Sequence, residues 1–440
     1  MGTDTQERKA EFMPGFDEAC FRALDGGREP ALLGAARRDA FEAYQLMPSP
    51  TARMEEWRRT DPARFPFGKL RVLSQATSGA PVNPGDWDQA FDVVVTVKDD
   101  GVAVADVSGA IKSGKVIAMP LADAAARHPD LLGEYLGTRA RRAKQGKFDV
   151  MNEAFWNVGV FVHVPPRVEL ERGILIRYEH ATAGSILVPR AIVVIGERSR
   201  ATIVEHLVSP DGALLMDVML KEFHIGPAAR LKVLSLQEWG NNTCHIASDW
   251  AFAAREAQIE WITLNFGGKL GKMSFASDVM GEGASAELDG LYFAAGNQHF
   301  DQKTLQVHSA PNTYSRLLYK GAVKDKAHSV YQGLIIARRG AVKVDAYQKN
   351  NNLVLSDGAR ADSLPGLEID ADDLKCSHGS TIGNLDPEQL FYLRTRGFNE
   401  AEARRTLIQA FFEEVAKRIP YEFVRERVYA HVEAGIAERA

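Results

Sequence analysis

Cysteine is scarce in this sequence, and long apolar runs are missing. The 440 residues contain three cysteines, Cys20, Cys244 and Cys376, which are odd in number and too scattered for a disulfide framework. We therefore expect a reducing compartment, the cytoplasm. The N-terminus lacks the apolar stretch of a signal peptide, and no run of about 18 apolar residues occurs. The sequence thus predicts neither a signal peptide nor a membrane span.

An excess of basic residues is also missing. The 53 Lys and Arg residues stand against 58 Asp and Glu residues, which gives a formal net charge of −5. This balance disfavours a protein whose main task is to bind nucleic acid backbones. Hydrophobic residues make up 45% of the chain and charged residues 25%, as in an ordinary folded protein. We therefore expect a folded protein without a nucleic-acid partner.

Complete catalytic motifs are absent as well. The sequence has no G-x-S-x-G elbow and no H-E-x-x-H pair. Residues 109–116 (GAIKSGKV) have the glycines and the lysine of a phosphate-binding loop, but Val116 stands where the motif needs a Ser or Thr hydroxyl for magnesium. We therefore expect a turn there, followed by a strand that runs into Pro120. The chain is predicted to be neither an ATPase nor a self-contained enzyme.

What the chain does contain is a weak internal repeat over its middle. A turn is followed by two residues two places apart on a strand, which share one face of that strand. The unit recurs at intervals of 25 to 30 residues, with a period near 28. Such a period in strand and turn units favours a β-solenoid, with an all-β sandwich as the alternative. The residue pairs are Ala201 and Ile203, Leu231 and Val233, Ala257 and Ile259, Ala286 and Leu288, Ser315 and Leu317, Val342 and Val344, and Leu367 and Ile369.

The region before the repeat has a different texture. Apolar residues at helical spacing predict a helix over residues 28–47, which the prolines that follow should end. Two short strands are expected over 91–97 and 102–107, on either side of an Asp-Asp-Gly turn. Residues 121–142 become helical again. This part of the chain should therefore be a mixed helical and α/β region.

The region after the repeat predicts three helices. Asp386 can cap the first helix, which Gly397 should stop, and Asn399 can cap the second, which should end before Pro420. Residues 421–438 can form the third helix. The predicted division of the chain is an N-terminal helical and α/β region at 1–150, a repeat core at 151–380 and a C-terminal helical domain at 381–440.

The candidates for metal ligands do not form a complete site in the sequence. Residues Cys376 and His378 would point to the same face of a strand, so that both could meet one ligand, whereas adjacent Cys244 and His245 would point apart. The alternative for the first pair is a small buried thiol beside a hydrogen-bonded imidazole. A structural role is favoured still more for His245, His299, His308 and His328.

Three segments resemble one family. Residues 375–397 (KCSHGSTIGNLDPEQLFYLRTRG) closely resemble the C-terminal motif of the SufB/SufD family, the core subunits of the SUF iron-sulfur cluster assembly machine. Residues 50–61 (PTARMEEWRRTD) and 348–356 (QKNNNLVLS) are further matches. The resemblance implies a right-handed parallel β-helix between terminal helical regions, in agreement with the period of the repeat.

Within this family the chain is most similar to SufD. Residues 358–366 (GARADSLPG) replace the SufB segment in which a Cys precedes Gly-Ala-His-Thr, and Cys376-Ser-His378-Gly-Ser replaces a Glu-His-Glu-Ala-Thr run. His378 therefore matches the SufD histidine implicated at the shared assembly site, with Cys376 beside it. The resemblance leaves two roles open for His378, direct ligation of iron or orientation of another ligand.

The resemblance also implies partners and excludes a resident cofactor. It predicts a non-catalytic scaffold subunit that pairs with a SufB-type subunit, docks SufC-type ATPases on its C-terminal helices, and carries a cluster only transiently within the complex. Two alternatives remain: a homodimer for storage or transport, and a metal-dependent enzyme that uses Cys376, His378 and a distant histidine. The predicted docking residues are Phe391, Tyr392, Arg394, Arg396, Phe411 and Phe412.

Overall fold

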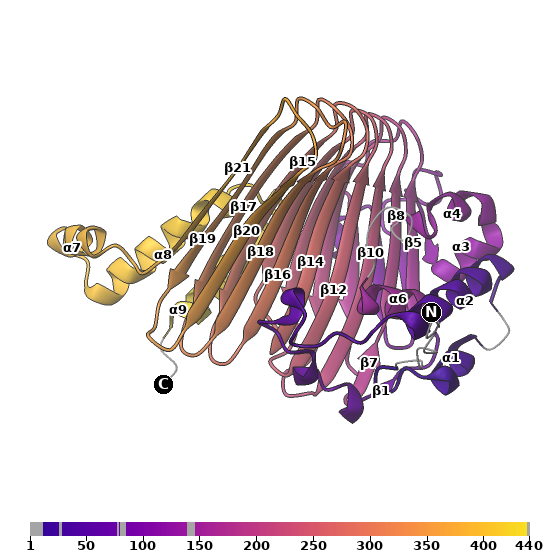
Figure 1. Ribbon diagram of the computed structural model, residues 1–440, viewed down its shortest axis with the longest axis horizontal. Helices are drawn as coiled ribbons and strands as arrows, with labels where there is room; N and C mark the ends of the chain where they lie inside the picture. Colours follow the sequence, from indigo (N-terminus) through magenta and orange to yellow (C-terminus); the bar gives the residue numbers. More distant parts are fainter. Residues whose placement is uncertain (1–11, 26–28, 77–78, 80–84, 139–145, 438–440) are drawn as a thin grey trace, which may run out of the picture.

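Two β-sheets coil into a solenoid of about eight turns that forms the body of the protein (Figure 1). The computed structural model describes residues 12–25, 29–76, 79, 85–138 and 146–437. Helices of the N-terminal region lie at one end of the solenoid, and the first of the C-terminal helices projects at the other. The predicted solenoid with flanking helical regions is confirmed. The sandwich alternative is wrong, because neighbouring turns pair in parallel.

Each turn of the solenoid contributes one strand to each sheet. Successive strands of a sheet are offset by 26 to 32 residues, in agreement with the predicted period. The first sheet contains β1 Arg71–Val72, β4 Ile117–Pro120, β5 Val158–Val164, β7 Ser185–Leu187, β8 Pro189–Ile195, β10 Leu215–Ile225, β12 Thr243–Ala253, β14 Leu270–Val279, β16 His299–His308, β18 His328–Ala337 and β20 Arg360–Ile369. The second sheet contains β2 Val93–Lys98, β3 Gly101–Asp106, β6 Ile174–Glu179, β9 Arg200–Val208, β11 Arg230–Glu238, β13 Gln258–Asn265, β15 Ser285–Ala294, β17 Tyr314–Val323, β19 Asp345–Val354 and β21 Lys375–Gly383.

Four of the seven predicted residue pairs have the right register. Their side chains stack in two columns on the inner face of the second sheet, where nearly all of them belong to one buried cluster. The parity of the strands was therefore readable from the sequence over most of the solenoid. The correctly placed pairs are Ala201 and Ile203, Leu231 and Val233, Ala286 and Leu288, and Ser315 and Leu317.

The other three predicted pairs are wrong. The corner at 338–344 is longer than the corner at 309–313, which moves the next strand along the chain and breaks a fixed period. The last predicted pair lies on β20, in the first sheet instead of the second. The two columns are held by Ile259 and Trp261 instead of Ala257 and Ile259, by Ala346 and Gln348 instead of Val342 and Val344, and by Cys376 and His378 instead of Leu367 and Ile369.

The corners that lead from the first sheet to the second fix the register of the turns. At each of them one residue has a positive φ, and at every corner but the last its backbone N–H donates to a carbonyl of the next turn. Arg198 donates to the Pro227 oxygen at 2.9 Å, and Ala228 to the Arg255 oxygen at 2.8 Å. Stacked corners therefore hold each turn in line with its neighbours. The left-handed residues are Arg167, Arg198, Ala228, Glu256, Gly283, Asn312, Lys343 and Asp373.

The interior of the solenoid changes from apolar to polar along its axis. Val160 and Ile176 represent the early turns, whose inward side chains are aliphatic and fully buried. In the middle turns the Lys221 ammonium lies inside, 2.6 Å from Glu205 Oε2 and 3.0 Å from Asp249 Oδ2. Since unpaired buried charges are costly, these groups compensate one another. Toward β21 uncharged polar side chains such as Gln348, Asn350 and Asn352 stand among apolar ones.

The N-terminal helices cover the outer face of the first sheet at its early strands. Phe155 and Tyr44 meet Phe161 and Ile192 there in one buried cluster. The predicted helix after residue 28 and the two predicted strands β2 and β3 are confirmed. Residues 121–135 form two helices instead of one because Pro129 keeps His128 out of the helical region; residues 139–142 lie outside the described residues. The helices are α1 Glu18–Asp25, α2 Ala31–Leu46, α3 Leu121–Arg127, α4 Pro129–Tyr135 and α6 Lys147–Phe155.

The segment that joins α2 to β1 runs as a strap over the outer face of the first sheet. It contains three short 3-10 helices, and a fourth precedes β2. The Trp57 ring lies under the Lys272 ammonium, 4.7 Å from its centroid, and the Thr60 hydroxyl donates to Asp301 Oδ2 at 2.5 Å. The strap therefore ties the N-terminal region to β14 and β16. The 3-10 helices are η1 Glu55–Trp57, η2 Pro62–Arg64, η3 Phe67–Lys69 and η4 Asp88–Ala90.

Two of the three C-terminal helices are clamped to the outer face of the second sheet. The Arg418 guanidinium binds both carboxylate oxygens of Asp289 at 2.9 Å. The Lys324 ammonium donates to the last carbonyls of α9, including that of Ile436 at 3.0 Å. The predicted caps at Asp386 and Asn399 are confirmed. The helices are α7 Pro387–Thr395, α8 Glu400–Ala416 and α9 Glu422–Ile436; none in the described part of the chain is long and apolar enough to span a membrane.

Glu238 is the centre of a second clamp between α9 and the solenoid. Its side chain is buried and pairs with His206 of the same sheet and with His431 and Arg427 of α9. Burial alone would raise the pKa of this carboxyl, but the hydrogen bonds and charges of the two histidines outweigh it and hold the pKa well below its ordinary value of 4.5.

We predict that Glu238→Gln lowers the unfolding free energy by about 2 kcal/mol at pH 7, because charged hydrogen bonds to a buried carboxylate are lost. A folded-state pKa below 4.5 means that the stabilisation is present above pH 4.5 and is lost as the pH falls below it. Urea unfolding of the wild type and the mutant at pH 7 and at lower pH measures the loss of free energy and its dependence on pH. Glu260→Gln, at an exposed position of the same sheet, serves as the control. A mutant difference that stays constant with pH would contradict this account.

Candidate functional site

The last turn of the solenoid leaves two strand edges unpaired. In the described part of the chain no strand lies beyond β20 or β21. Lys375 donates its N–H to Val344 in the preceding turn, at 2.8 Å. Successive residues of a strand direct their backbone groups to opposite sides, so those of Cys376 and His378 face the free edge. The end of the solenoid is thus a template for pairing with another strand.

The inward side chains of β21 form the outermost layer of the solenoid interior, which we call the end layer. Cys376 and His378 stand in register with Ala346 and Gln348 of the turn below and continue their columns. The prediction that these two residues share a strand face is confirmed. Because no further turn covers them, His378 is exposed and Cys376 is half-buried.

The Cys376 thiol lies in a small apolar cluster with Ile335 and Val344. Burial raises the pKa of this thiol, and the negative charge of Asp345 raises it further. Because the thiolate is the form that binds metals, the free chain holds Cys376 in its poorly coordinating state. The exposed imidazole of His378 is the more accessible donor of the two.

A chain of hydrogen bonds joins the end layer to the turn below. Ser380 donates to Ser363 on the facing strand at 2.7 Å, and Ser363 donates to Asn350 Oδ1 at 2.7 Å. Asn352 Nδ2 donates to the same oxygen at 2.6 Å, and the Tyr292 hydroxyl donates to Asn352. The two sheets are therefore linked across the interior at the end of the solenoid by polar side chains.

The other predicted cysteine and histidine candidates lie away from this layer. Cys244 belongs to the outer cluster under the N-terminal helices, whereas His245 points inward to Asp217 at 2.5 Å, so the two side chains point apart as expected. Each of the other three candidate histidines has a hydrogen-bond partner in the fold. Among the described residues no group of three or more His, Cys, Asp or Glu side chains is placed to hold a metal ion. The pairs are His299 with Thr60, His308 with Thr313 and Ser315, and His328 with Asp362.

The predicted docking residues fall into two groups. The helix α7 projects from the body and buries none of its residues (Figure 1). Its Phe391 and Tyr392 are 67% and 57% exposed, and Arg394 and Arg396 lie beside them. Phe412, by contrast, is 1% exposed because α8 packs it against Phe293, and Phe411 lies partly buried beside it. Only the α7 residues are accessible, which sequence periodicity alone did not reveal.

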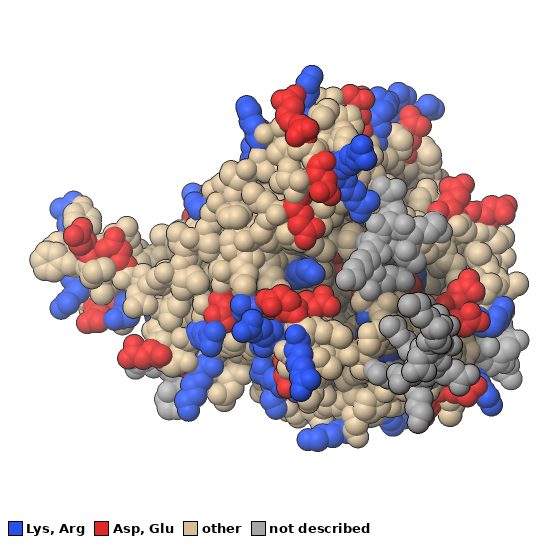
Figure 2. Space-filling view, in the orientation of Figure 1, with Lys and Arg blue, Asp and Glu red and all other residues tan. Residues whose placement is uncertain are grey.

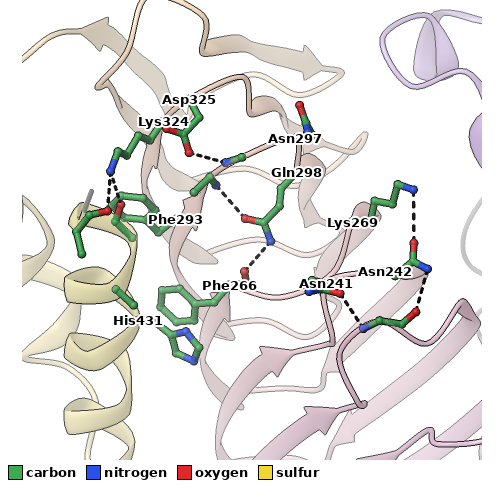
Figure 3. A pocket seen from close by; sticks show the side chains of 16 residues that line it. Asn241, Asn242, Phe266, Lys269, Phe293, Asn297, Gln298, Lys324, Asp325 and His431 are labelled. Carbon is green, nitrogen blue, oxygen red and sulfur yellow. Dashed lines mark hydrogen bonds between the residues drawn. The ribbon is translucent and has the colours of Figure 1, made fainter. Parts of the chain in front are cut away.

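A polar groove of about 580 Å³ lies elsewhere, between α9 and the corners that lead from the second sheet to the first (Figure 3). Gln298 crosses its floor and donates to the carbonyls of Phe266 and Gly268. Lys324 spans from its corner to α9. None of the residues that line this groove belongs to β20 or β21. The groove is therefore separate from the end layer.

The comparisons with known proteins cover nearly the whole chain. A family profile described as "SUF system FeS cluster assembly, SufBD core domain" matches residues 178–411, and one described as "SufBD protein N-terminal region" matches residues 22–176. These two matches join the solenoid and the N-terminal region in one family architecture.

Curated relatives agree with the family profiles. An iron-sulfur cluster assembly SufBD family protein of Mycobacterium tuberculosis is 38% identical over 251 residues, which are 55% of this chain and 60% of the relative. The iron-sulfur cluster assembly protein SufD of Escherichia coli is 32% identical over 54% of this chain and 56% of its own length. SufD of Bacillus subtilis is 26% identical over 93% of this chain and 95% of its own length. The chain belongs to the SufBD family of iron-sulfur cluster assembly proteins.

Proposed function

We propose that this chain is a SufD-type scaffold subunit that builds an iron-sulfur cluster jointly with a SufB-type partner at its end layer. One observation carries the proposal: Cys376 and His378 lie side by side on the inner face of a strand whose own edge is unpaired. Iron and sulfide are the cargo of this site, and the isolated chain needs no resident cofactor. The subunit acts by holding ligands and partners in the cytoplasm, without catalysing a reaction of its own.

The end of the solenoid suits a partner that also has a strand edge. Its free backbone groups can extend both sheets by strand addition. Leu367, Ile369 and Ile382 are inward residues that would be covered by a further turn, yet they are 38%, 39% and 48% exposed. In Figure 2 the surface around β20 and β21 is mostly uncharged, while charged residues gather at the corners and along the strap. Exposed apolar and main-chain groups together favour a second solenoid end as the partner.

The two donors of the end layer favour a shared site over a self-contained one. A cluster needs more ligands than one imidazole and one thiol, and the described residues supply no third donor beside them. The partner would therefore provide the remaining ligands. Exposed His378 is the more accessible of the two donors, whereas half-buried Cys376 has to lose its proton before it can bind iron.

The helix α7 supports a second partner, a SufC-type ATPase. Only residues 384–386 separate β21 from α7, while α8 and α9 are clamped to the second sheet. Exposed aromatic and arginine side chains on α7 are typical of binding hot spots. A movement of α7 with its bound ATPase would therefore be transmitted directly to β21, the strand that carries His378.

The homodimer remains the second candidate, because an unpaired edge can also meet a second copy of itself about a twofold axis. The mass of the purified chain, with and without a SufB-type subunit, distinguishes the two. A heterodimer should replace any homodimer when both chains are present. No observation favours the metal-dependent enzyme.

We predict that His378→Ala leaves folding and partner binding intact but lowers the cluster yield of the reconstituted complex about tenfold, as loss of a metal-site residue does. The complex is purified anaerobically through a tag on this chain, and its mass and iron-sulfur absorbance are measured. Ser377→Ala, next to His378 on the outer face of β21, is the matched control. A normal cluster yield from the His378→Ala complex would remove this histidine from the site.

We predict that the double change Phe391→Ala and Tyr392→Ala weakens binding of the ATPase at least tenfold while the melting temperature stays within about 2 °C, because both side chains are exposed. Titration calorimetry with the ATPase and thermal unfolding measure the two effects. Phe412→Ala is the contrasting control, since it should cost about 3–5 kcal/mol of stability by opening a cavity. Unchanged affinity in the α7 variant would contradict the assignment of α7 as a docking helix.

A further inference from the structure

Gln348 lies directly below His378 and has no hydrogen-bond partner. It stands in register with His378 on the neighbouring strand β19, and it is fully buried. Neither Oε1 nor Nε2 of its carboxamide is hydrogen-bonded. An unpaired buried polar group costs about 1–3 kcal/mol, so a protein that keeps one without a use for it loses stability.

The other amides of this layer are satisfied, which sets Gln348 apart. Asn350 and Asn352 point inward from the same strand and hydrogen-bond to each other and to Tyr292 and Ser363. Among the buried amide side chains of the described residues, Gln348 is the one that lacks a partner at both atoms. Gln302 and Gln306 of the same interior each lack a partner at one amide atom only. Gln348 thus differs from them in that its whole carboxamide is unpaired.

The facing strand leaves room for this carboxamide. A Cβ built on Gly333 of β18 would lie 2.7 Å from Gln348 Oε1 and 2.6 Å from the Tyr331 hydroxyl, closer than atoms can approach. A side chain at Gly333 would therefore displace the amide, which reaches into the space that the glycine leaves. In the last turn Gly333 is followed in register by Pro365, as Gln348 is followed by His378.

His378 and Pro365 stand at the same level across the end layer. Ser380 and Ser363 are hydrogen-bonded to each other across the interior, and the two strands run in opposite directions there. Two residues along each strand from this bond lie His378 and Pro365. By register, Pro365 is thus the residue across the interior from His378, and Gln348 is its neighbour in the turn below. The proline ring offers the imidazole no hydrogen bond, whereas the carboxamide offers both a donor and an acceptor.

We propose that Gln348 is a positioning residue for His378, an inference that rests on the proposed function of the end layer. In the complex its Oε1 accepts the N–H of the imidazole, so that the other ring nitrogen presents its lone pair outward to iron. An outer partner of this kind fixes the tautomer and the orientation of a histidine ligand. The unpaired amide of the free chain is then a group held ready for the assembled site.

The test is Gln348→Met, which keeps the length of the side chain and removes the amide. Since it replaces an unpaired buried polar group by an apolar one, the melting temperature should stay the same or rise. The cluster yield of the complex with SufB-type and SufC-type subunits should fall about tenfold, as expected for an outer partner of a metal ligand. Gly333→Ala, which displaces the amide, should lower the yield as well.

A second readout does not depend on cluster formation. The chain labelled with nitrogen-15 at histidine is bound to its unlabelled SufB-type partner, and the ring resonances of His378, assigned with His378→Ala, report the tautomer. One tautomer should dominate in the wild type, and the mixture should shift in Gln348→Met. Unchanged resonances and unchanged cluster yield in Gln348→Met would overturn the proposal. If instead His378→Ala itself gave a normal yield, the proposed function of the end layer would fail, whatever the resonances of the Gln348 variant.

Discussion

The parallel stacking of turns in register is the constraint on which the rest of this structure depends. Hydrogen bonds between left-handed corners and along both sheets place each residue above its counterpart in the preceding turn. Inward columns therefore continue to the last turn, where Cys376 and His378 occupy two of them. The site is the exposed end of a periodic interior, and it requires no separate loop or inserted domain to position its donors.

Ending a solenoid without a cap exposes the groups that a further turn would satisfy. Two strand edges, a set of inward apolar side chains and a polar layer are open at once. Natural proteins usually cover or block such edges, because they promote aggregation. An uncapped end is compatible with a subunit that functions in a complex.

The sequence predicted the architecture well and the register only in part. The strand period is visible as a repeat in the sequence. Residues 376 and 378 share a face because side chains alternate along a strand, which holds even if the strand bounds are off by a few residues. The longer corner at 338–344 breaks the period, and no residue in it indicates the extra length. Amphipathic patterns could not tell exposed Phe391 from buried Phe412. The pattern shows that a helix has an apolar face, but it does not show whether another part of the chain covers that face. The unpaired amide of Gln348 could not be predicted, because the sequence does not show which residues of the facing sheet lie next to it.

We propose above all that partner and cargo meet this chain at the free edges of β20 and β21. Hydrogen exchange of backbone amides tests it most directly, in the isolated chain and in the complex with its SufB-type partner. We predict that the amides of Cys376, His378, Ser380 and Ile382, which face the free edge, exchange rapidly in the monomer and become protected in the complex. Protection elsewhere, with these four amides still exchanging at their free rate, would contradict it.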